Sequence, residues 1–357
     1  MKKSPFSKNL KNIFIIFFII IFFSNNSLSE VTFKNQKNYH MNSDIIGYIK
    51  HNPIYIMNNS GFTFENGVIS GNGTKQNPYI IEGWDILLKK GKDQNSYAIL
   101  IENTDSYFVI RNCYIHHYNS FWSHLSYLFI WSVDWGIHFG NVLNGKIDNC
   151  YITGTGHTIR LSNSNNNIIS NCYYDSNGCG IGVFEKSCNN SVINCHSHNY
   201  VCGVCIYYNS CNNTIKNCSA ILSFNIFHSP FNIMRQKGLG TGWVGFYIFE
   251  KSSNNKIINC NSYSYEKPLK NMLIKGFYKK TIEGFHLTRE SKGNIIQNCT
   301  SYNLPVGIRV ENSDSSNVVK DCILLNNYYG IFSIQSPSTI FQNNSFIGNI
   351  INIVNKK

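Results

Sequence analysis

The chain repeats one short motif along most of its length, and this repetition constrains its fold more than any other feature of the sequence. The clearest copies run from a glycine to an Asn-Cys pair, as in residues 180–195 and 203–218. Each copy holds two short stretches that alternate between apolar and polar residues, separated by a polar, Asn-rich turn. Alternation with period two predicts β-strands, and clusters of Asn and Gly predict turns. Strands repeated at a constant spacing are typical of a solenoid.

The length of the repeat predicts a single-stranded, right-handed parallel β-helix, which is an all-β solenoid. A coil of about 23 residues holds three short strands and three turns, so that each strand stacks about 4.8 Å from its copy in the next coil. Parallel β crossovers are right-handed in nearly all cases. Left-handed β-helices are built on hexapeptides, which do not fit this spacing. Leucine-rich repeats, the main competing fold, need a leucine framework where this chain has Ile, Val and Phe.

Asn residues recur at two fixed positions of the coil. Asn tolerates the left-handed backbone of a tight turn, and its amide can bond to the amides above and below it in a stack. We therefore expect two structural Asn ladders with no catalytic role. The first consists of Asn112, Asn149, Asn171, Asn194, Asn217, Asn259 and Asn298, and the second of Asn167, Asn190, Asn213, Asn255, Asn294 and Asn317.

The 13 cysteines recur mostly once per coil rather than in pairs. Cys behaves as a small, buried apolar residue, so we expect a mostly reduced, buried ladder. Stacked Cα atoms lie within the disulfide range, however, so occasional bridges between coils stay open as an alternative. Cys202 and Cys205 have the spacing of a metal-binding pair, but no second pair accompanies them at zinc-finger spacing, and the register of the coils explains their positions.

Residues 1–29 have the layout of a secretory signal peptide, with four lysines before an apolar run at 13–23 and small residues after it. The run is shorter than the roughly 20 residues that a membrane-spanning helix needs. We therefore expect a protein that is secreted to the extracellular space or the cell surface, without a membrane span once the signal is removed. Residues 30–52 are irregular and are the expected N-terminal cap, and residues 53–357 are the expected β-helix.

The formal net charge of +12 at pH 7 favours anionic partners such as acidic polysaccharides or surface glycans. The alternative is that the lysines only solubilise the coil edges and prevent edge-to-edge association. The sequence has no dense basic cluster, so we expect no nucleic acid partner.

Three coils carry long insertions at the same turn, namely residues 116–135, 224–243 and 265–283. In the compact coils only about eight residues separate the Cys from the next Gly. Insertions at one turn emerge from one edge of a solenoid and commonly build its binding face. These insertions are rich in aromatic residues and His, which fits binding. The alternative is that they pack on the solenoid wall as small local cores.

The strand after that turn is the predicted floor of a cleft, and its outward residues are the candidate binding residues. Aromatic faces beside His and Arg suit sugar rings and their hydroxyl or carboxylate groups, although an ordinary exposed sheet also tolerates stacked aromatics. The predicted first column is His138, Thr158, Gly182, Cys205, Tyr247, His286 and Arg309, and the second is Gly140, Arg160, Phe184, Tyr207, Phe249, Thr288 and Glu311. The predicted substrate-binding set is His138, Arg160, Phe184, Tyr207, Tyr247, Phe249, His286, Arg309 and Glu311.

The repeats resemble those of NosD-like and related carbohydrate-processing proteins of the pectate-lyase-like β-helix class. Residues 53–86, with GNGTKQNPYIIEGWDI, resemble the opening of many archaeal surface proteins of that type. The resemblance implies the fold. For function it implies a range that includes polysaccharide lyases, hydrolases, uronate epimerases and a periplasmic protein that assists the assembly of a copper centre. In the resembling polysaccharide enzymes, the strand face described above carries the active site.

The sequence contains no recognisable catalytic pair of carboxylates. Glycoside hydrolysis needs two carboxyl groups about 5 to 9.5 Å apart, whereas Glu102 and Glu311 lie many coils apart. Binding of an extracellular polysaccharide or surface glycan is therefore the predicted function. The alternative is a polysaccharide lyase or epimerase with an Arg, His or Tyr base.

Copper handling is a further alternative, for which the close histidine pairs are His116–His117 and His196–His198. One isolated pair of histidines rarely makes a metal site, so we predict no metal site and no cofactor.

Overall fold

A computed structural model describes residues 47–88, 95–117, 133–176, 178–199, 202–222, 243–265, 282–313 and 316–356. The expected signal peptide and most of the expected cap lie outside these residues. The described part of the chain consists of strands and turns with a single 3-10 turn, η1 (Asn59–Gly61), and it contains no helix that is long and apolar enough to cross a membrane.

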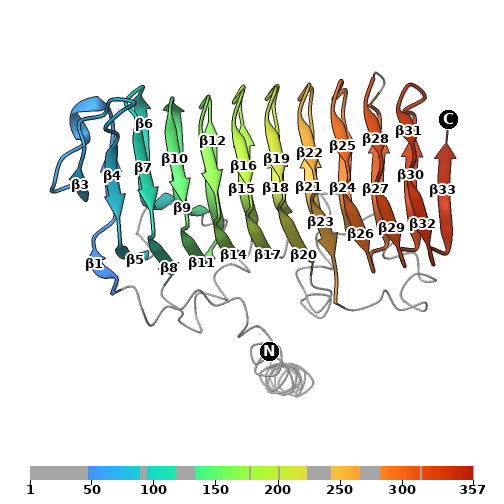
Figure 1. Cartoon of the computed structure of the whole chain (residues 1–357), viewed down its shortest axis with the longest axis horizontal. Coiled ribbons are helices and arrows are strands. Elements are labelled where there is room, and N and C mark those ends of the chain that lie inside the picture. The colour runs from blue at the N-terminus through green and yellow to red at the C-terminus, as the bar shows by residue number, and fades with distance from the viewer. Residues whose placement is uncertain are drawn as a thin grey trace, which may run out of the picture. The chain divides into compact units, whose positions relative to one another are not determined.

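The strands form three sheets of 11 strands each, and every coil contributes one strand to each sheet (Figure 1). We call them sheets A, B and C. Sheet A consists of β1 (Ile49–His51), β5 (Trp84–Leu88), β8 (Tyr114–His117), β11 (Tyr151–Thr155), β14 (Tyr173–Ser176), β17 (His196–Asn199), β20 (Ser219–Leu222), β23 (Asn261–Tyr263), β26 (Thr300–Tyr302), β29 (Ile323–Leu325) and β32 (Ser345–Ile347).

Sheet B consists of β2 (Ile54–Ile56), β6 (Asn95–Thr104), β9 (Val133–Val142), β12 (His157–Ser162), β15 (Cys179–Phe184), β18 (Cys202–Ile206), β21 (Trp243–Ile248), β24 (Ile282–Thr288), β27 (Val306–Glu311), β30 (Tyr329–Ile334) and β33 (Ile351–Lys356). Sheet C consists of β3 (Val68–Ser70), β4 (Tyr79–Glu82), β7 (Phe108–Arg111), β10 (Gly145–Asp148), β13 (Ile168–Ser170), β16 (Ser191–Ile193), β19 (Thr214–Lys216), β22 (Lys256–Ile258), β25 (Ile295–Gln297), β28 (Val318–Lys320) and β31 (Ile340–Gln342).

The strands pair in parallel throughout the described coils, apart from the antiparallel pair β3–β4 near the start. The predicted parallel β-helix is therefore confirmed. Strand β1 lies inside the segment expected as the cap and already pairs with β5, as the first rung of sheet A.

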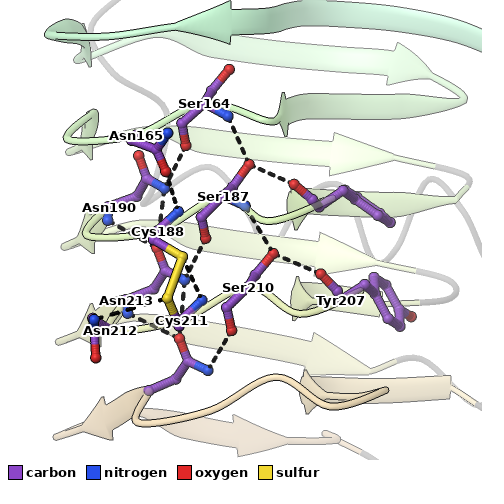
Figure 2. The surroundings of a disulfide bond; sticks show 12 residues. Ser164, Asn165, Ser187, Cys188, Asn190, Tyr207, Ser210, Cys211, Asn212 and Asn213 are labelled. Atoms are coloured by element: carbon purple, nitrogen blue, oxygen red, sulfur yellow. Dashed lines mark hydrogen bonds between the residues drawn. A yellow bond between two sulfur atoms is a disulfide. The ribbon is translucent and has the colours of Figure 1, made fainter.

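The core between the sheets is filled by stacked apolar side chains and by the Cys column. Phe246 and Phe285, for example, stack with their ring centroids 5.1 Å apart. The seven Asn-Cys cysteines from Cys113 to Cys299, and Cys322, are buried and free, which confirms the expected ladder. One disulfide, Cys188–Cys211, joins two neighbouring coils with a Cα–Cα distance of 4.6 Å (Figure 2). This bond confirms the alternative prediction, that occasional disulfides join neighbouring coils.

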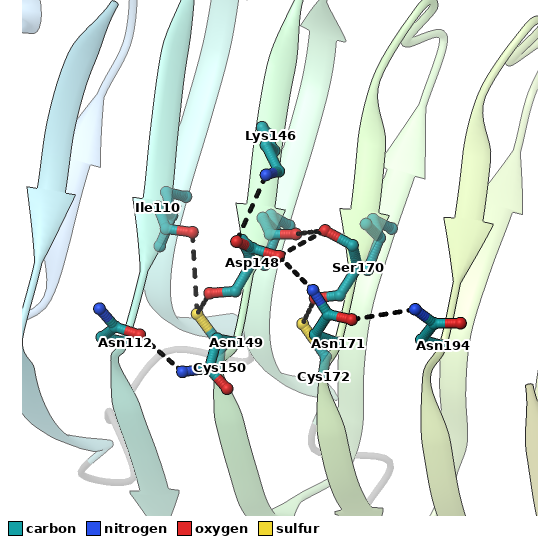
Figure 3. Close-up of polar contacts among 12 residues, drawn as sticks. Ile110, Asn112, Lys146, Asp148, Asn149, Cys150, Ser170, Asn171, Cys172 and Asn194 are labelled. Carbon is teal, nitrogen blue, oxygen red and sulfur yellow. Dashed lines mark hydrogen bonds and ion pairs between the residues drawn. The ribbon is translucent and has the colours of Figure 1, made fainter.

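Both predicted Asn ladders are present. In the second ladder, the buried amide of Asn213 accepts hydrogen bonds from the backbone N of Asn190 at 2.8 Å and from its Nδ2 at 3.1 Å (Figure 2). In the first ladder, Nδ2 of Asn194 donates to Oδ1 of Asn171 at 3.2 Å, and Asn171 in turn donates to Asp148 (Figure 3). The first-ladder residues have positive φ angles, such as 54° at Asn171, as expected for left-handed turns.

A glycine recurs where the chain enters sheet B, because the coils approach too closely there for a side chain. A Cβ atom added at Gly203 would lie 2.4 Å from the carbonyl oxygen of Gly245, and one at Gly245 would lie 2.7 Å from that of Gly284. The same conflict continues at Gly307 and Gly330. This column explains the glycine that begins each copy of the motif.

The three insertions all connect sheet A to sheet B, between β8 and β9, β20 and β21, and β23 and β24. The described ends of the three insertions therefore lie along the same edge of the solenoid, as predicted. Their ends belong to strands, since His116 and His117 lie in β8, Trp243 lies in β21 and Glu283 lies in β24. Residues 118–132, 223–242 and 266–281 lie outside the described part of the chain.

Candidate functional site

The outer face of sheet B holds a cavity of about 580 Å³, which we call the sheet-B hollow. Its lining extends across the coils from β6 to the turn after β24. Aromatic, basic and acidic side chains contribute, together with one thiol. The lining residues are Tyr97, Trp135, His157, Arg160, Cys179, Phe184, Tyr207, Tyr208, Phe249, Glu250 and Arg289.

One half of the hollow is organised around Arg160, on β12. Its guanidinium lies 5.0 Å from the ring centroid of Trp135 and 4.8 Å from that of Phe184, so it contacts both aromatic faces. Nη2 of Arg160 donates to Oε1 of Glu185 at 2.9 Å, and Nε donates to Ser162 at 2.6 Å. These contacts fix the orientation of the guanidinium at the wall of the hollow.

The other half is organised around Phe249 and Arg289. The guanidinium of Arg289 lies 4.5 Å from the centroid of Phe249, and its Nη1 lies 3.7 Å from Oε1 of Glu250. Tyr207 lies between the two halves, with ring centroids 4.9 Å from Phe184 and 5.2 Å from Phe249. A row of aromatic rings is therefore flanked by an arginine at each end.

The turn that follows these sheet-B strands has an unusual backbone. Four consecutive coils place two successive non-glycine residues there with positive φ, at a cost of about 1–2 kcal/mol for each residue. Hydrogen bonds between coils hold the turn, for example from Lys186 N to Tyr208 O and from Lys251 N to Arg289 O, both 2.9 Å. Conformations of this kind cluster at functional sites. The residues concerned are Glu185 and Lys186, Tyr208 and Asn209, Glu250 and Lys251, and Arg289 and Glu290.

A buried network of charged side chains lies beside the hollow, on β24 and β27. Nδ1 of His286 lies 2.6 Å from Oε2 of Glu283, and Nη1 of Arg309 donates to Oε1 of Glu283 at 3.0 Å. Nε of Arg309 donates to Glu311 at 2.9 Å. Burial raises the pKa of Glu283, but its charged contacts with His286 and Arg309 outweigh burial and hold that pKa below its ordinary value. We call these four residues the charged network.

Two further sheet-B residues pack against these groups: Tyr247 contacts the charged network, and His138 contacts residues of the hollow. The ring of Tyr247 stacks on His286 at 4.8 Å, and burial raises the pKa of its hydroxyl. His138 contacts the rings of Tyr97 and Trp135 edge-on, at 5.3 and 5.8 Å. Burial and, after it, the charge of Arg160 lower the pKa of His138 to about 4. Its ring is therefore neutral near pH 7.

The predicted binding residues fall into three groups in the structure. The hollow is lined by Arg160, Phe184, Tyr207 and Phe249. The charged network holds His286, Arg309 and Glu311, with Tyr247 packed against it. His138 packs against hollow residues. The face predicted as one cleft thus consists of the aromatic sheet-B hollow and, beside it, the mostly buried charged network.

The predicted register of one coil is wrong. Arg160 pairs with His138 and so belongs to the first outward column, whereas it was expected in the second; Thr158 is fully buried. The error arises because Gly156 resembles the glycine that begins the motif. In the structure Thr158 occupies that position and Ile159 is the first inward residue, so the inward and outward positions of this coil lie two residues later than expected.

Several residues of the hollow and of the charged network were missed because they lie at strand ends, outside the alternating part of the motif. The signal that identifies some of them is the large or charged residue after the strand in successive coils, as in Glu250 and Arg289. Glu283 was assigned to an insertion, although it is the residue before the entry glycine. The missed residues are Tyr97, His157, Cys179, Tyr208, Glu250, Glu283 and Arg289, whereas Trp135 was predicted only as an aromatic residue of the insertion at 116–135.

The two close histidine pairs have other partners. Nε2 of His116 lies 2.8 Å from Oδ1 of Asp85, and Nδ1 of His196 lies 2.8 Å from Oγ of Ser219. Nδ1 of His198 lies 3.9 Å from Oδ2 of Asp175. Across the described ranges, no three His, Cys, Asp or Glu side chains are grouped so that they could hold a metal ion.

Comparison with known proteins identifies the repeats. The sequence model described as "Right handed beta helix region" matches residues 79–220 and 242–357. No curated protein matches the sequence.

Among solved structures, similar chains include an alginate lyase from Paenibacillus sp. str. FPU-7, with 11% identity, a TM-score of 0.48 and coverage of 84% of this chain and 99% of that one. The catalytic domain of a GH87 α-1,3-glucanase in complex with nigerose has 13% identity, a TM-score of 0.49 and coverage of 89% and 69%. The surface adhesin PfbA of Streptococcus pneumoniae has 13% identity, a TM-score of 0.41 and coverage of 78% and 76%. At these identities and TM-scores the likenesses carry no conclusion about substrate or activity.

Proposed function

This chain belongs to the right-handed β-helix family, and on that basis we propose that it binds an extracellular polysaccharide in the sheet-B hollow. The observation that carries the proposal is the row Phe184, Tyr207 and Phe249 between Arg160 and Arg289. Sugar rings stack on aromatic faces, while arginines bind hydroxyl and carboxylate oxygens. Concave sites lined by aromatic residues and a few charged groups are typical of ligand sites.

The geometry of the solenoid suits a polymer better than a single sugar. The lining of the hollow runs from β6 to the turn after β24, so it crosses successive coils along the solenoid axis. Neighbouring strands are spaced by about 4.8 Å, which is close to the length of one pyranose unit in an extended chain. A polysaccharide lying along the axis would therefore place roughly one sugar on each coil.

An anionic polymer is the preferred ligand class. The side chain of Arg289 is 62% exposed, and its carboxylate partner Glu250 lies 3.7 Å away, so a ligand carboxylate has access to the guanidinium. Arg160 is more enclosed, yet it lines the hollow. The formal net charge of +12 attracts anionic polymers over longer distances.

A protein that binds extracellular polysaccharide must be exported, and residues 1–29 supply the expected signal. N-terminal sequencing of protein collected outside the producing cell checks this part of the proposal. We expect a mature chain that begins near residue 30. Retention of the full-length chain inside the cell would contradict it.

The binding proposal is tested with a glycan array followed by calorimetry on the best ligand. We expect the double variant Phe184→Ala and Phe249→Ala to weaken binding at least tenfold, since each contact between an aromatic ring and a sugar ring is worth about 1 kcal/mol or more. Tyr151→Ala is the control, because Tyr151 stacks on Tyr173 on sheet A, away from the hollow. Absence of binding to every glycan, or equal loss in the control, would reject the proposal.

A polysaccharide lyase is the second candidate function, and the charged network is the observation that favours it. Glu283 orients the His286 ring beside Tyr247 and Arg309, which places a base next to a group that stabilises a carboxylate. Lyase action on a uronate polymer would release unsaturated products that absorb ultraviolet light. If no such product forms and His286→Gln leaves binding unchanged, the lyase function is excluded.

A further inference from the structure

Three thiols meet at the wall of the sheet-B hollow, apart from the buried Cys ladder. Cys179, at the start of β15, is partly exposed and lines the hollow. Cys202 and Cys205, on β18, are buried behind it and pack in the outer apolar cluster with Cys179. One accessible thiol therefore faces the hollow, and two buried thiols lie beside it.

The register of the sheet places Cys179 directly opposite Cys202. The two residues pair across β15 and β18 in parallel, which sets their Cα atoms about 4.8 Å apart. They are separated by 23 residues, as are Cys188 and Cys211, which already form a disulfide with a Cα–Cα distance of 4.6 Å. The solenoid thus accommodates a disulfide between neighbouring coils at this offset, and both distances lie in the usual range.

The surroundings make Cys179 the most reactive of these three thiols. Hydrogen bonds from Cys202 and Cys205 and contact with the His157 ring lower the pKa of Cys179 well below its usual value, against the effect of burial. Burial, followed by the contact with Cys179, raises the pKa of Cys202. The thiolate is the nucleophile in disulfide chemistry, so Cys179 reacts first and Cys202 reacts in the second step.

We propose that Cys179 is a redox-reactive thiol at the wall of the hollow and that Cys202 is its resolving partner. An accessible cysteine beside a resolving cysteine is the arrangement of thiol redox sites. The ladder cysteines differ from this pair because they face the core. Cys195, for example, is fully buried, and its Sγ donates to the carbonyl of Ile193 at 3.4 Å.

The reaction has two balanced steps with a low-molecular-weight disulfide as the oxidant. The Cys179 thiolate attacks one sulfur of the oxidant, which forms a mixed disulfide and releases one thiolate. Cys202 then loses its proton and attacks Sγ of Cys179, which forms the Cys179–Cys202 disulfide and releases the second thiolate. The protons of the two protein thiols end on the two released small thiols. Two cysteines are oxidised while one small disulfide is reduced.

The test treats the folded protein with oxidised glutathione, blocks the remaining thiols, and maps disulfides by mass spectrometry after digestion without reductant. We expect a peptide linked through Cys179 and Cys202. Cys202→Ser should trap glutathione on Cys179, and Cys179→Ser should abolish the fast reaction. Cys195→Ser is the control and should leave the linked peptide unchanged.

A second measurement uses the unmodified protein and does not depend on how the variants fold. Alkylation with iodoacetamide should label Cys179 first, at a rate that stays high at pH values where an ordinary thiol reacts slowly. A His157→Gln variant should shift that pH profile upward, because the imidazole contact contributes to the reactivity. Labelling of Cys179 no faster than the ladder thiols, or a link from Cys179 to Cys205 in place of Cys202, would overturn the proposal.

Discussion

Nδ1 of His286 lies 2.6 Å from Oε2 of Glu283, and the Glu283 side chain is only 2% exposed. The other carboxylate oxygen of Glu283 accepts a hydrogen bond from Arg309 at 3.0 Å. A buried carboxylate is costly unless it is paired and hydrogen-bonded, and here one oxygen contacts the His286 ring and the other accepts from the Arg309 guanidinium. Glu283 therefore holds together two strands of sheet B, β24 and β27.

Replacement of Glu283 by Gln should destabilise the protein by about 3 kcal/mol, because it leaves Arg309 and His286 buried beside a neutral amide. Urea unfolding followed by circular dichroism measures the change. The control is Glu290→Gln, since Glu290 is 74% exposed and lies 3.7 Å from Lys251. Exposed pairs contribute little, so a control that loses as much stability as Glu283→Gln would contradict the assignment.

The half-buried ring of His138 predicts that acid destabilises the fold. Its pKa is lowered to about 4, while a His in the unfolded chain has a pKa of about 6.5. Between these values the unfolded state binds more protons than the folded state, so stability falls as the pH is lowered from 6.5 to 4. The loss should be about 2 kcal/mol after allowance for the partial exposure of the ring.

The pH effect is isolated by comparing wild type with His138→Gln in urea unfolding at several pH values. The difference between the two proteins should change over this window and stay constant above pH 7. His196→Gln serves as the control, since His196 is exposed on sheet A. Parallel pH curves for wild type and His138→Gln would show that His138 carries none of the effect.

The second Asn ladder predicts a large penalty for removing one rung. Asn213 accepts from the backbone N of Asn190 at 2.8 Å and donates to Ser187 and Asn255. Asn213→Ala leaves these buried groups without partners and should cost about 2 kcal/mol or more in unfolding free energy. Asn261→Ala, at an exposed position of β23, is the matched control and should change the unfolding midpoint little.

The glycine column predicts that a single methyl group disrupts stacking. In Gly245→Ala the new Cβ would lie 2.1 Å from Oγ of Ser262 and 2.7 Å from the carbonyl oxygen of Gly284, so β21 must shift. We expect a loss of about 2 kcal/mol in unfolding free energy. Gly47→Ala should be neutral because, among the described residues beyond its chain neighbours, no atom lies within 4 Å of its Cβ position. Equal melting temperatures for both variants would contradict the packing explanation.

The fold could be predicted from the sequence because its determinants are local and repeated. The alternation of apolar residues, the Asn before each Cys and the entry glycine each recur at fixed offsets, so one correct coil predicts its neighbours. The stacked bonds of Asn190 with Asn213 are what such a repeat requires. The prediction failed where one glycine, Gly156, resembled the start of a motif two residues early.

The candidate site could be predicted only in part, because its residues are where the repeat varies. Phe184 and Phe249 were found since they occupy an alternating column. Arg289 and Glu250 were missed because they follow the strand, in a turn whose direction depends on positive φ angles. Nor does the repeat indicate that Glu283 turns toward Arg309, since that contact joins neighbouring coils through side chains that no other coil shares.

In-register stacking also determines how a chain of this kind can change its size. A coil contacts only the coils directly before and after it. The loss or gain of one complete coil therefore leaves the remaining coils with equivalent partners. An insertion or deletion of one residue within a strand instead swaps its inner and outer faces. Adding whole coils would lengthen the solenoid stepwise, by one strand spacing for each coil.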